Sequence, residues 1–464
     1  MPTLAPPRAD ARLDTIREKV LAGERLSIDD GMLLYETPDL WGVFELAGIV
    51  RDRLHPGVAY YNVNRHLNYS NICALSCKFC EFYRKKGDDG AYTHDMDSIA
   101  DEARKACESG ATEIHVVGGL QPYLPFDYYT DLIRTIKRVA AEHGTDLYVK
   151  AFTAVEIVHL AKIAKKYKRN NRRESIRLIL TELKEAGLGS LPGGGAEVFD
   201  DRVHDETHKG KIRSDEWLDV HMVAHELGLN TNATILYGHI DNRRERLVHM
   251  EILRRAQDAA LSRMGYEGEA TERRSDAATE GLVALAGIDA PVITLTRPGT
   301  PLPQTPNPRA NGRIPEPPKQ PDASVASASA SSPPSGYFQT ITPLPFIPDG
   351  SELEHLPGPS GLENMRTIAI ARLMLDNFPH VKAFWIMQTL PMAQIMLDAG
   401  ADDIDGTVVW YDITKVGGSD THQEVTVPVL RRAIREAGYE PVERDTLYRR
   451  VQRDGNRWWV CSKP

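Results

Sequence analysis

Three cysteines in one short stretch are the residues of this chain best suited to metal chemistry. Cys73, Cys77 and Cys80 are separated by three and two residues, directly after an apolar run expected to form a strand. Thiolates in such a tight loop can hold an iron–sulfur cluster or a zinc ion. Neither Cys107, in a helical pattern, nor Cys461, near the end, is placed to be a fourth ligand. Three cysteine ligands would leave one metal position open.

Two glycine-rich stretches are candidates for close contact with a ligand. Gly118 and Gly119 end another expected strand, where a backbone without side chains can approach a bound molecule. Three glycines at 193–195 cost chain entropy without adding packing, and Glu197 follows them. Glu197 could accept hydrogen bonds from ribose hydroxyls, and Arg202 could pair with a carboxylate. A surface turn with a solvated glutamate is the alternative.

The elements that must position these residues follow a strand-then-helix rhythm. Helical patterns between the expected strands end in glycine, as at Gly110 and Gly187. This rhythm predicts a parallel TIM-type (β/α) barrel, partial or full, although a doubly wound open sheet would show the same pattern. Eight strands are expected. The first lies directly before Cys73, and the others begin at Glu113, Asp146, Gly189, Thr231, Tyr337, Val381 and Asp403.

One segment interrupts the rhythm. Residues 291–335 hold twelve prolines in 45 positions and end in an Ala/Ser-rich run, a composition that predicts disorder. The insert separates a helix from the next strand, so we expect it at the end of the barrel opposite the active site. The predicted organisation is a helical extension (1–55), a first barrel part with the cysteine loop (56–262), the disordered insert (263–335), a second barrel part (336–448) and a tail (449–464).

Composition excludes several classes of function. The formal net charge is −9 and basic residues form no long run, so nucleic acid is not an expected partner. Neither a signal-peptide pattern nor an apolar run of membrane-spanning length occurs, which predicts a cytoplasmic protein without a membrane span. Five cysteines, three of them clustered, suit a reducing compartment better than a disulfide framework.

The cysteine spacing, with the aromatic Phe79 before the third cysteine, resembles the radical S-adenosylmethionine superfamily. The resemblance implies a [4Fe-4S] cluster held by the three cysteines and S-adenosylmethionine bound at its open iron. It also implies that the glycine pair contacts the methionine moiety. The residues expected around this cofactor are Phe79, Gly118, Gly119 and Glu197.

Longer stretches resemble one family within that superfamily. RHLNYSN before the cysteines, GGLQP, KAFTAVEI, SLPGGGAE and TNATILYGHI are similar to the aminodeoxyfutalosine synthases of the futalosine route to menaquinone, over roughly 50–260 and 336–450. The resemblance implies that a 5′-deoxyadenosyl radical adds to 3-[(1-carboxyvinyl)oxy]benzoate. The products would be 6-amino-6-deoxyfutalosine, methionine and CO2 or bicarbonate, with S-adenosylmethionine consumed and a flavodoxin or ferredoxin supplying the electron.

The chain departs from this family at two positions and leaves alternatives open. Gln121 and Ile347 stand where the family often has histidine. A dehypoxanthine futalosine cyclase or a deazaflavin-forming radical enzyme would use the same cysteines, and a non-catalytic iron–sulfur or zinc protein would not cleave S-adenosylmethionine. Because the expected substrate has two carboxylates, cationic and donor groups should line its site; the candidates are Arg65, His66, Arg202 and His239.

Overall fold

Seven parallel strands form one curled sheet in the computed structural model, which describes residues 9–268, 290–297, 299–303, 335–408 and 423–461. Neighbours in the sheet follow the order of the chain, which confirms the predicted TIM-type architecture in its partial form. The strands are β2 (Asn64–Leu67), β3 (Glu113–Val116), β4 (Tyr148–Ala151), β5 (Ser190–Leu191), β6 (Asn230–Tyr237), β7 (Phe338–Pro345) and β8 (His380–Val381).

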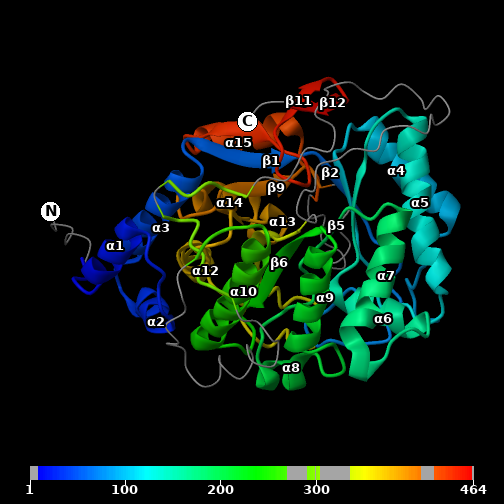
Figure 1. The fold of residues 1–464 in the computed structure, drawn as a ribbon, viewed down its shortest axis with the longest axis horizontal. Coiled ribbons are helices and arrows are strands. Elements are labelled where there is room, and N and C mark those ends of the chain that lie inside the picture. Colours follow the sequence, from blue (N-terminus) through cyan, green and yellow to red (C-terminus); the bar gives the residue numbers. More distant parts are fainter. Residues whose placement is uncertain (1–8, 269–289, 298, 304–334, 409–422, 462–464) are drawn as a thin grey trace.

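Helices connect these strands and cover the outside of the sheet (Figure 1). The helices α4 and α7 are followed by Gly110 and Gly187, whose positive φ angles of 71° and 116° suit the predicted glycine stops. The connecting helices are α4 (Met96–Glu108), α5 (Phe126–Glu142), α6 (Ala154–Ile163), α7 (Arg172–Ala186, after a short turn at Arg169–Asn171), α8 (Asp201–Thr207), α9 (Ser214–Glu226), α10 (Arg243–Arg263), α12 (Gly361–Met374), α13 (Trp385–Gln388) and α14 (Leu390–Met396).

The eighth expected strand, β9 (Asp403–Gly406), belongs to a separate parallel sheet. The strand order in this second sheet is β10-β1-β9. Strand β1 spans Val58–Asn62, and β10 (Glu440–Glu443) follows helix α15 (Val427–Glu436). The Ala383 N–H donates to the Asp403 carbonyl at 2.8 Å, so β9 also lies against the chain that leaves β8. Since β1 runs on into β2, β9 lies close to both edges of the curled sheet.

The two ends of the chain form small additions to the barrel. Helices α1 (Leu13–Ala22), α2 (Ile28–Glu36) and α3 (Leu40–Leu54) confirm the predicted helical extension and lie together at one side of the molecule (Figure 1). The predicted tail contains an antiparallel hairpin of β11 (Val451–Asp454) and β12 (Arg457–Val460). No helix among the described residues is both long and apolar enough to cross a lipid bilayer.

Part of the predicted disordered insert is packed. Ile293 and Leu295 are buried against the end of α10 and against Tyr337, so the expected disorder does not extend to residues 290–297. Apolar residues within the Pro-rich composition explain this difference, because they cover an otherwise exposed helix end. The insert's residues 269–289, 298 and 304–334 lie outside the described part. The described part meets the barrel where β7 begins, the end opposite the cysteines, as expected.

Candidate functional site

The three cysteines line one cavity of about 330 Å3 at the end of the barrel where the parallel strands finish. Their loop follows β2 and is held on two sides by the backbone. Ala74 donates its N–H to the Leu120 carbonyl at 2.9 Å, and Lys78 donates to the Thr207 carbonyl at 2.8 Å. The loop is therefore fixed against the chain that follows β3 and against α8. We call this space the cysteine cavity.

The chemistry of the sulfur atoms fits a multi-iron cluster. Backbone N–H groups of Leu75 and Leu120 each approach the Cys73 sulfur at 3.4 Å. Burial raises the pKa of Cys77 to about 12, so a thiolate there needs a cationic centre to stabilise it. Cys107 and Cys461 do not line this cavity.

The glycine pair after β3 is required by close packing on the cysteine loop. A Cβ atom on Gly118 would lie 2.7 Å from the Tyr69 ring, and one on Gly119 would lie 2.4 Å from the Ile72 carbonyl oxygen. The buried Glu156 carboxylate accepts the Gly118 N–H at 3.1 Å, and burial raises the pKa of Glu156 to about 7. Any side chain at the pair would displace the loop that carries Cys73.

The glycine run at 193–195 packs against neighbouring elements as well as lining the cavity. A Cβ atom on Gly193 would lie 2.5 Å from the backbone of Ala233 on β6, and one on Gly195 would lie 2.3 Å from Val155. The close approach expected from the sequence is thus made in part by the protein itself. Sequence reasoning missed these neighbours because Ala233 and Val155 are about 40 residues away on either side.

Glu197 forms an ion pair with Lys211, and both side chains line the cavity near the cysteines. Burial lowers the pKa of Lys211, but Glu197 and Cys77 outweigh this effect and raise it above its usual value. The lysine is therefore charged, and its amino group lies 5.6 Å from the centre of the Phe79 ring. A fixed cation next to Cys77 favours the thiolate form of that cysteine.

Phe79 is held between two histidines rather than being free at the rim. Its ring lies 6.1 Å from that of His239, nearly parallel, and 5.7 Å from that of His208. His239 accepts the Ile240 N–H at Nδ1 and donates from Nε2 to the Leu236 carbonyl. Both ring nitrogens of His239 are thus engaged with backbone, and its side chain is not among those that line the cavity.

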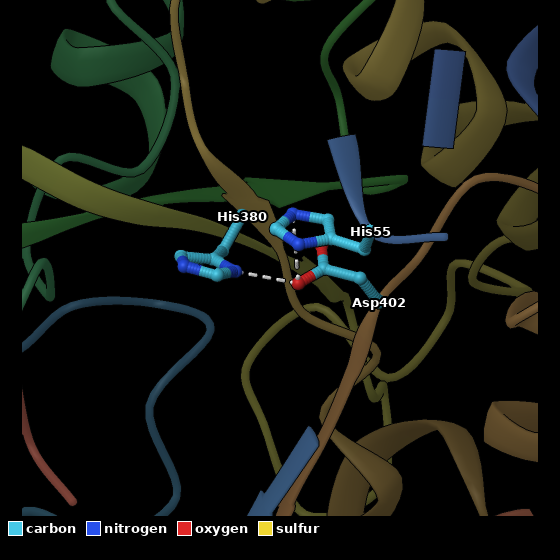
Figure 2. A group of neighbouring side chains, drawn as sticks. All are labelled: His55, His380 and Asp402. Atoms are coloured by element: carbon cyan, nitrogen blue, oxygen red, sulfur yellow. Dashed lines mark hydrogen bonds and ion pairs between the residues drawn. The ribbon is translucent and has the colours of Figure 1, made fainter. Parts of the chain in front are cut away.

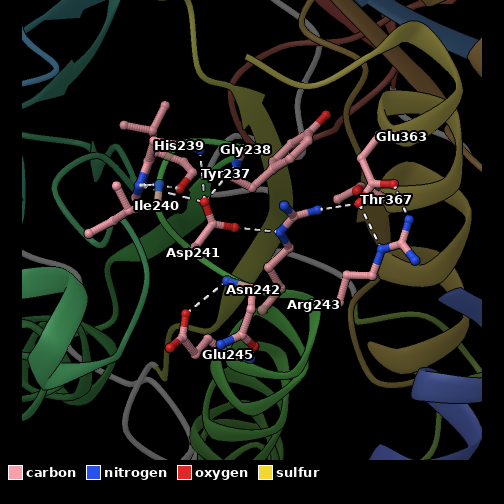
Figure 3. A network of polar contacts seen from close by, with 12 residues as sticks. Tyr237, Gly238, His239, Ile240, Asp241, Asn242, Arg243, Glu245, Glu363 and Thr367 are labelled. Carbon is pink, nitrogen blue, oxygen red and sulfur yellow. Dashed lines mark hydrogen bonds and ion pairs between the residues drawn. The ribbon is translucent and has the colours of Figure 1, made fainter. Parts of the chain in front are cut away.

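A polar network fixes the loop that carries His239 (Figure 3). The Asp241 carboxylate accepts the backbone N–H groups of Gly238 and His239 at 2.8 and 2.9 Å. Arg246 bonds to Asp241 and also to Glu363 on α12, at 2.7 Å to the latter. The loop after β6 is therefore anchored to two helices, which positions the aromatic support behind Phe79.

The deep end of the cavity is polar, and sequence reasoning found only one of its residues, His66. We call this group the pocket floor: His66, Glu113, His115, Lys150, Lys382 and Asp405. Lys150 pairs with Glu113 at 2.8 Å, and Lys382 pairs with Asp405 at 3.0 Å. A signal was present in the sequence, because both lysines occur in the same tetrapeptide, Val-Lys-Ala-Phe, where a buried strand has no evident use for a charge.

The two arginine candidates lie elsewhere. Arg65 forms a salt bridge with Glu102 on α4 at 2.7 Å, and Arg202 pairs with Glu245 on α10 at 2.9 Å. Neither lines the cysteine cavity. Of the two positions that depart from the family pattern, Ile347 lines the cavity, whereas Gln121 is buried beside it and donates to Thr93 at 3.1 Å.

A second group of metal-ligand types lies where β8 and β9 begin, at the end of the barrel opposite the cysteines. Figure 2 shows its three side chains. His55, His380 and Asp402 converge, with their donor atoms within 4.8 Å of one another. His55 Nε2 donates to the Pro379 carbonyl at 2.7 Å, and His380 Nδ1 bonds to Asp402 at 2.6 Å. Asp402 also pairs with the fully buried Arg372. These donors already have partners, so we assign this cluster to packing rather than to metal binding.

Comparisons with known families agree with the cysteine site. The model for the radical SAM superfamily matches residues 67–253, and the model for the CofH/MqnC C-terminal region matches residues 335–455. Aminodeoxyfutalosine synthase of Thermus thermophilus is 37% identical, over 96% of this chain and 97% of that protein. The enzyme of the same name from Streptomyces coelicolor is 34% identical, over 93% of this chain and 92% of that protein.

More distant relatives and solved structures extend the comparison. FO synthase of Nocardia farcinica is 30% identical over 92% of this chain, which spans 40% of that protein. The crystal structure of methylornithine synthase aligns with a TM-score of 0.58 at 14% identity, covering 92% of this chain and 97% of that one. The hydrogenase maturase HydG of Carboxydothermus hydrogenoformans aligns with the same score over 94% and 80%. At this identity the structures establish the shared fold.

Proposed function

The chain belongs to the aminodeoxyfutalosine synthase family of the radical S-adenosylmethionine superfamily, and we propose that it adds the 5′-deoxyadenosyl group of S-adenosylmethionine to 3-[(1-carboxyvinyl)oxy]benzoate. The products are 6-amino-6-deoxyfutalosine, methionine and CO2 or bicarbonate, in menaquinone biosynthesis. The observation that carries the proposal is a three-cysteine loop facing a cavity at the end of the barrel, in a chain similar to these synthases along nearly its whole length.

Cys73, Cys77 and Cys80 fit a [4Fe-4S] cluster in number, in sequence spacing and in facing one cavity. When bound, such a cluster supplies the electron for reductive cleavage of S-adenosylmethionine. The chain's own residues bind and orient the cofactor. Gly118, Gly119 and Glu197 line the same cavity as the cysteines, which supports a role for the glycine pair beside the methionine moiety and for Glu197 as an acceptor for the ribose hydroxyls.

The cavity also has to exclude water from a reactive carbon radical. Its walls near the cysteines include Phe79, Leu120, Val155, Leu344 and Phe346. Apolar walls of this kind leave the acceptor's double bond as the available partner for the radical. A flavodoxin or ferredoxin as electron donor and a cytoplasmic location stay predictions.

Product analysis tests this function directly. The protein is reconstituted anaerobically with iron and sulfide, reduced, and given S-adenosylmethionine alone, with the enolpyruvyl benzoate, or with dehypoxanthine futalosine. We expect a coupled product that contains the adenosyl group and forms only with both substrates present. Release of free 5′-deoxyadenosine with a cyclised product from dehypoxanthine futalosine would instead indicate the cyclase. The absence of any S-adenosylmethionine cleavage would indicate a non-catalytic iron–sulfur protein.

A further inference from the structure

The strand register places polar side chains on one level of the barrel interior. His66 on β2, His115 on β3 and Lys150 on β4 are direct neighbours across the sheet. The interior layers of a closed TIM barrel are usually filled with branched apolar side chains. Here the same level borders a cavity, and Lys382 and Asp405 reach it from the other side. The interior is therefore built to hold a polar group.

Two lysines supply the positive charge of this floor. The side chains of Lys150 and Lys382 are only 4% and 7% exposed, and they pair with the carboxylates of Glu113 and Asp405 respectively. A lysine ammonium group has three donors, so each can bind a further acceptor. Burial lowers the pKa of Lys150, Glu113 opposes this effect and the charge of Lys382 adds to it. The two ammonium groups therefore act on the same region.

The His115 imidazole is a third polar group of the floor. The His115 Nε2 atom is inaccessible to solvent and has no hydrogen-bond partner among the described residues. Burial lowers the pKa of His115 well below its usual value, so the ring is neutral and its Nε2 donates or accepts a hydrogen bond according to the tautomer. An unsatisfied polar atom next to a cavity calls for a ligand or an ordered water. It lies beside Lys150 in the register, on the same face of the sheet.

The geometry of the acceptor determines which of its carboxylates reaches the floor. The adenosyl group is delivered from the cysteine rim, so the acceptor's vinyl group and the carboxylate attached to it must face that rim. The ring carboxylate is meta to the ether oxygen, on the part of the molecule that lies away from the vinyl group, and so can point inward.

We propose that Lys150 and Lys382 bind this ring carboxylate at the pocket floor and thereby set the enzyme's preference for an acidic aromatic acceptor. The assignment rests on the function proposed above. Lys150 and Lys382 are positioning residues for the acceptor, since they lie away from the carbon atoms that react. Their removal lowers acceptor affinity and leaves S-adenosylmethionine binding unchanged.

The test compares the diacid with its ring methyl ester in four reconstituted proteins: wild type, Lys150→Met, Lys382→Met and Lys166→Met. Lys166 forms an ion pair with Glu182 outside the cavity and is the matched control. We expect the wild type and the control to bind the diacid about tenfold to a hundredfold more tightly than the ester. Each floor variant loses this preference, while the cluster signal and the affinity for S-adenosylmethionine stay at the wild-type level.

A double variant controls for the possibility that the single change impairs folding. Lys150→Met leaves Glu113 buried without its partner, so Lys150→Met/Glu113→Gln removes both charges and keeps the floor neutral. A folded paired variant that still prefers the diacid over the ester to the wild-type extent would overturn the assignment while the proposed function stands. Failure of the wild type to form any adduct from the diacid would refute the proposed function, and the carboxylate assignment with it.

Discussion

The two ends of the barrel each bring together three side chains of metal-binding type, yet they are organised in opposite ways. At the rim, the three cysteines are half-buried and face a cavity. At the far end, His55 and Asp402 are 1% and 0% exposed, and the imidazole and carboxylate groups bond to one another, to backbone and to Arg372. Closeness of ligand types is therefore a poor guide to a metal site. Ligand atoms that face a cavity and lack protein partners are a better guide to such a site.

The comparison predicts the largest effect at the cysteines. Changing Cys77 to alanine removes one cluster ligand, and we expect loss of turnover to below about one thousandth of the wild-type rate, because removing a key catalytic group commonly costs this much or more. Iron content and the electron paramagnetic resonance signal of the reconstituted protein measure the cluster, and mass spectrometry measures the product. Wild-type turnover in this variant would contradict the assignment.

Cys107 provides the matched control for this experiment. It is buried on α4, outside the cysteine cavity, and its replacement by alanine removes the same thiol group. We expect Cys107→Ala to retain both cluster and turnover. Equal losses in the two variants would mean that cysteine replacement acts through folding rather than through ligation.

At the opposite end we expect an effect on stability instead of chemistry. Asp402→Asn leaves Arg372 fully buried without a countercharge, which costs about 3–5 kcal/mol of unfolding free energy. Denaturant unfolding measures the loss, and iron bound per folded molecule should match the wild type. A variant that kept its stability but lost turnover would make the His55, His380 and Asp402 cluster a functional site, and the contrast between the two ends would fail.

Sequence reasoning succeeded where a feature is local. The cysteine spacing, the glycine pair and the glycine helix stops are each read within about ten residues, and the structure places the glycine pair against the loop that leads into Cys73. The alternation of apolar runs and helices predicted the barrel for the same reason. Burial patterns of single strands and helices are encoded in adjacent residues.

Features that depend on distant partners could not be predicted in this way. Arg65 and Arg202 had the right chemistry for a carboxylate, but Glu102 and Glu245 pair with them from helices far along the chain. His55 and Asp402 meet across almost 350 residues. Lys150 could have been predicted as a site residue from the sequence, because a lysine in an otherwise apolar strand conflicts with burial, and such conflicts mark functional sites.

A smaller effect is expected at Glu197 on the rim. If Glu197 accepts the ribose hydroxyls as proposed, Glu197→Gln weakens this charge-assisted contact, along with the ion pair to Lys211, by roughly 1.5–3 kcal/mol. The affinity for S-adenosylmethionine should fall about tenfold to a hundredfold. It is measured by titrating S-adenosylmethionine and recording the change in the cluster's electron paramagnetic resonance signal. Glu245→Gln, which disturbs the pair with Arg202 outside the cavity, is the control and should bind normally. Equal affinities in the two variants would assign Glu197 to support of Lys211 alone.

The smallest effect is expected from the insert, which joins the barrel at the end away from the cysteines. Deleting 304–334 behind a short Gly/Ser linker should leave turnover within about twofold of wild type, because its composition predicts no packed structure. The linker has little distance to cover, since the Tyr337 hydroxyl donates to the Pro303 carbonyl at 3.4 Å.

A longer deletion, of 265–334, also removes Ile293 and Leu295 and uncovers the end of α10. Burial of two such side chains is worth about 3–6 kcal/mol, so the longer deletion should unfold at lower denaturant while its folded fraction turns over normally. A large loss of turnover in the shorter deletion, with the cluster intact, would show that the insert reaches the rim, and the functional separation of the two ends would be wrong.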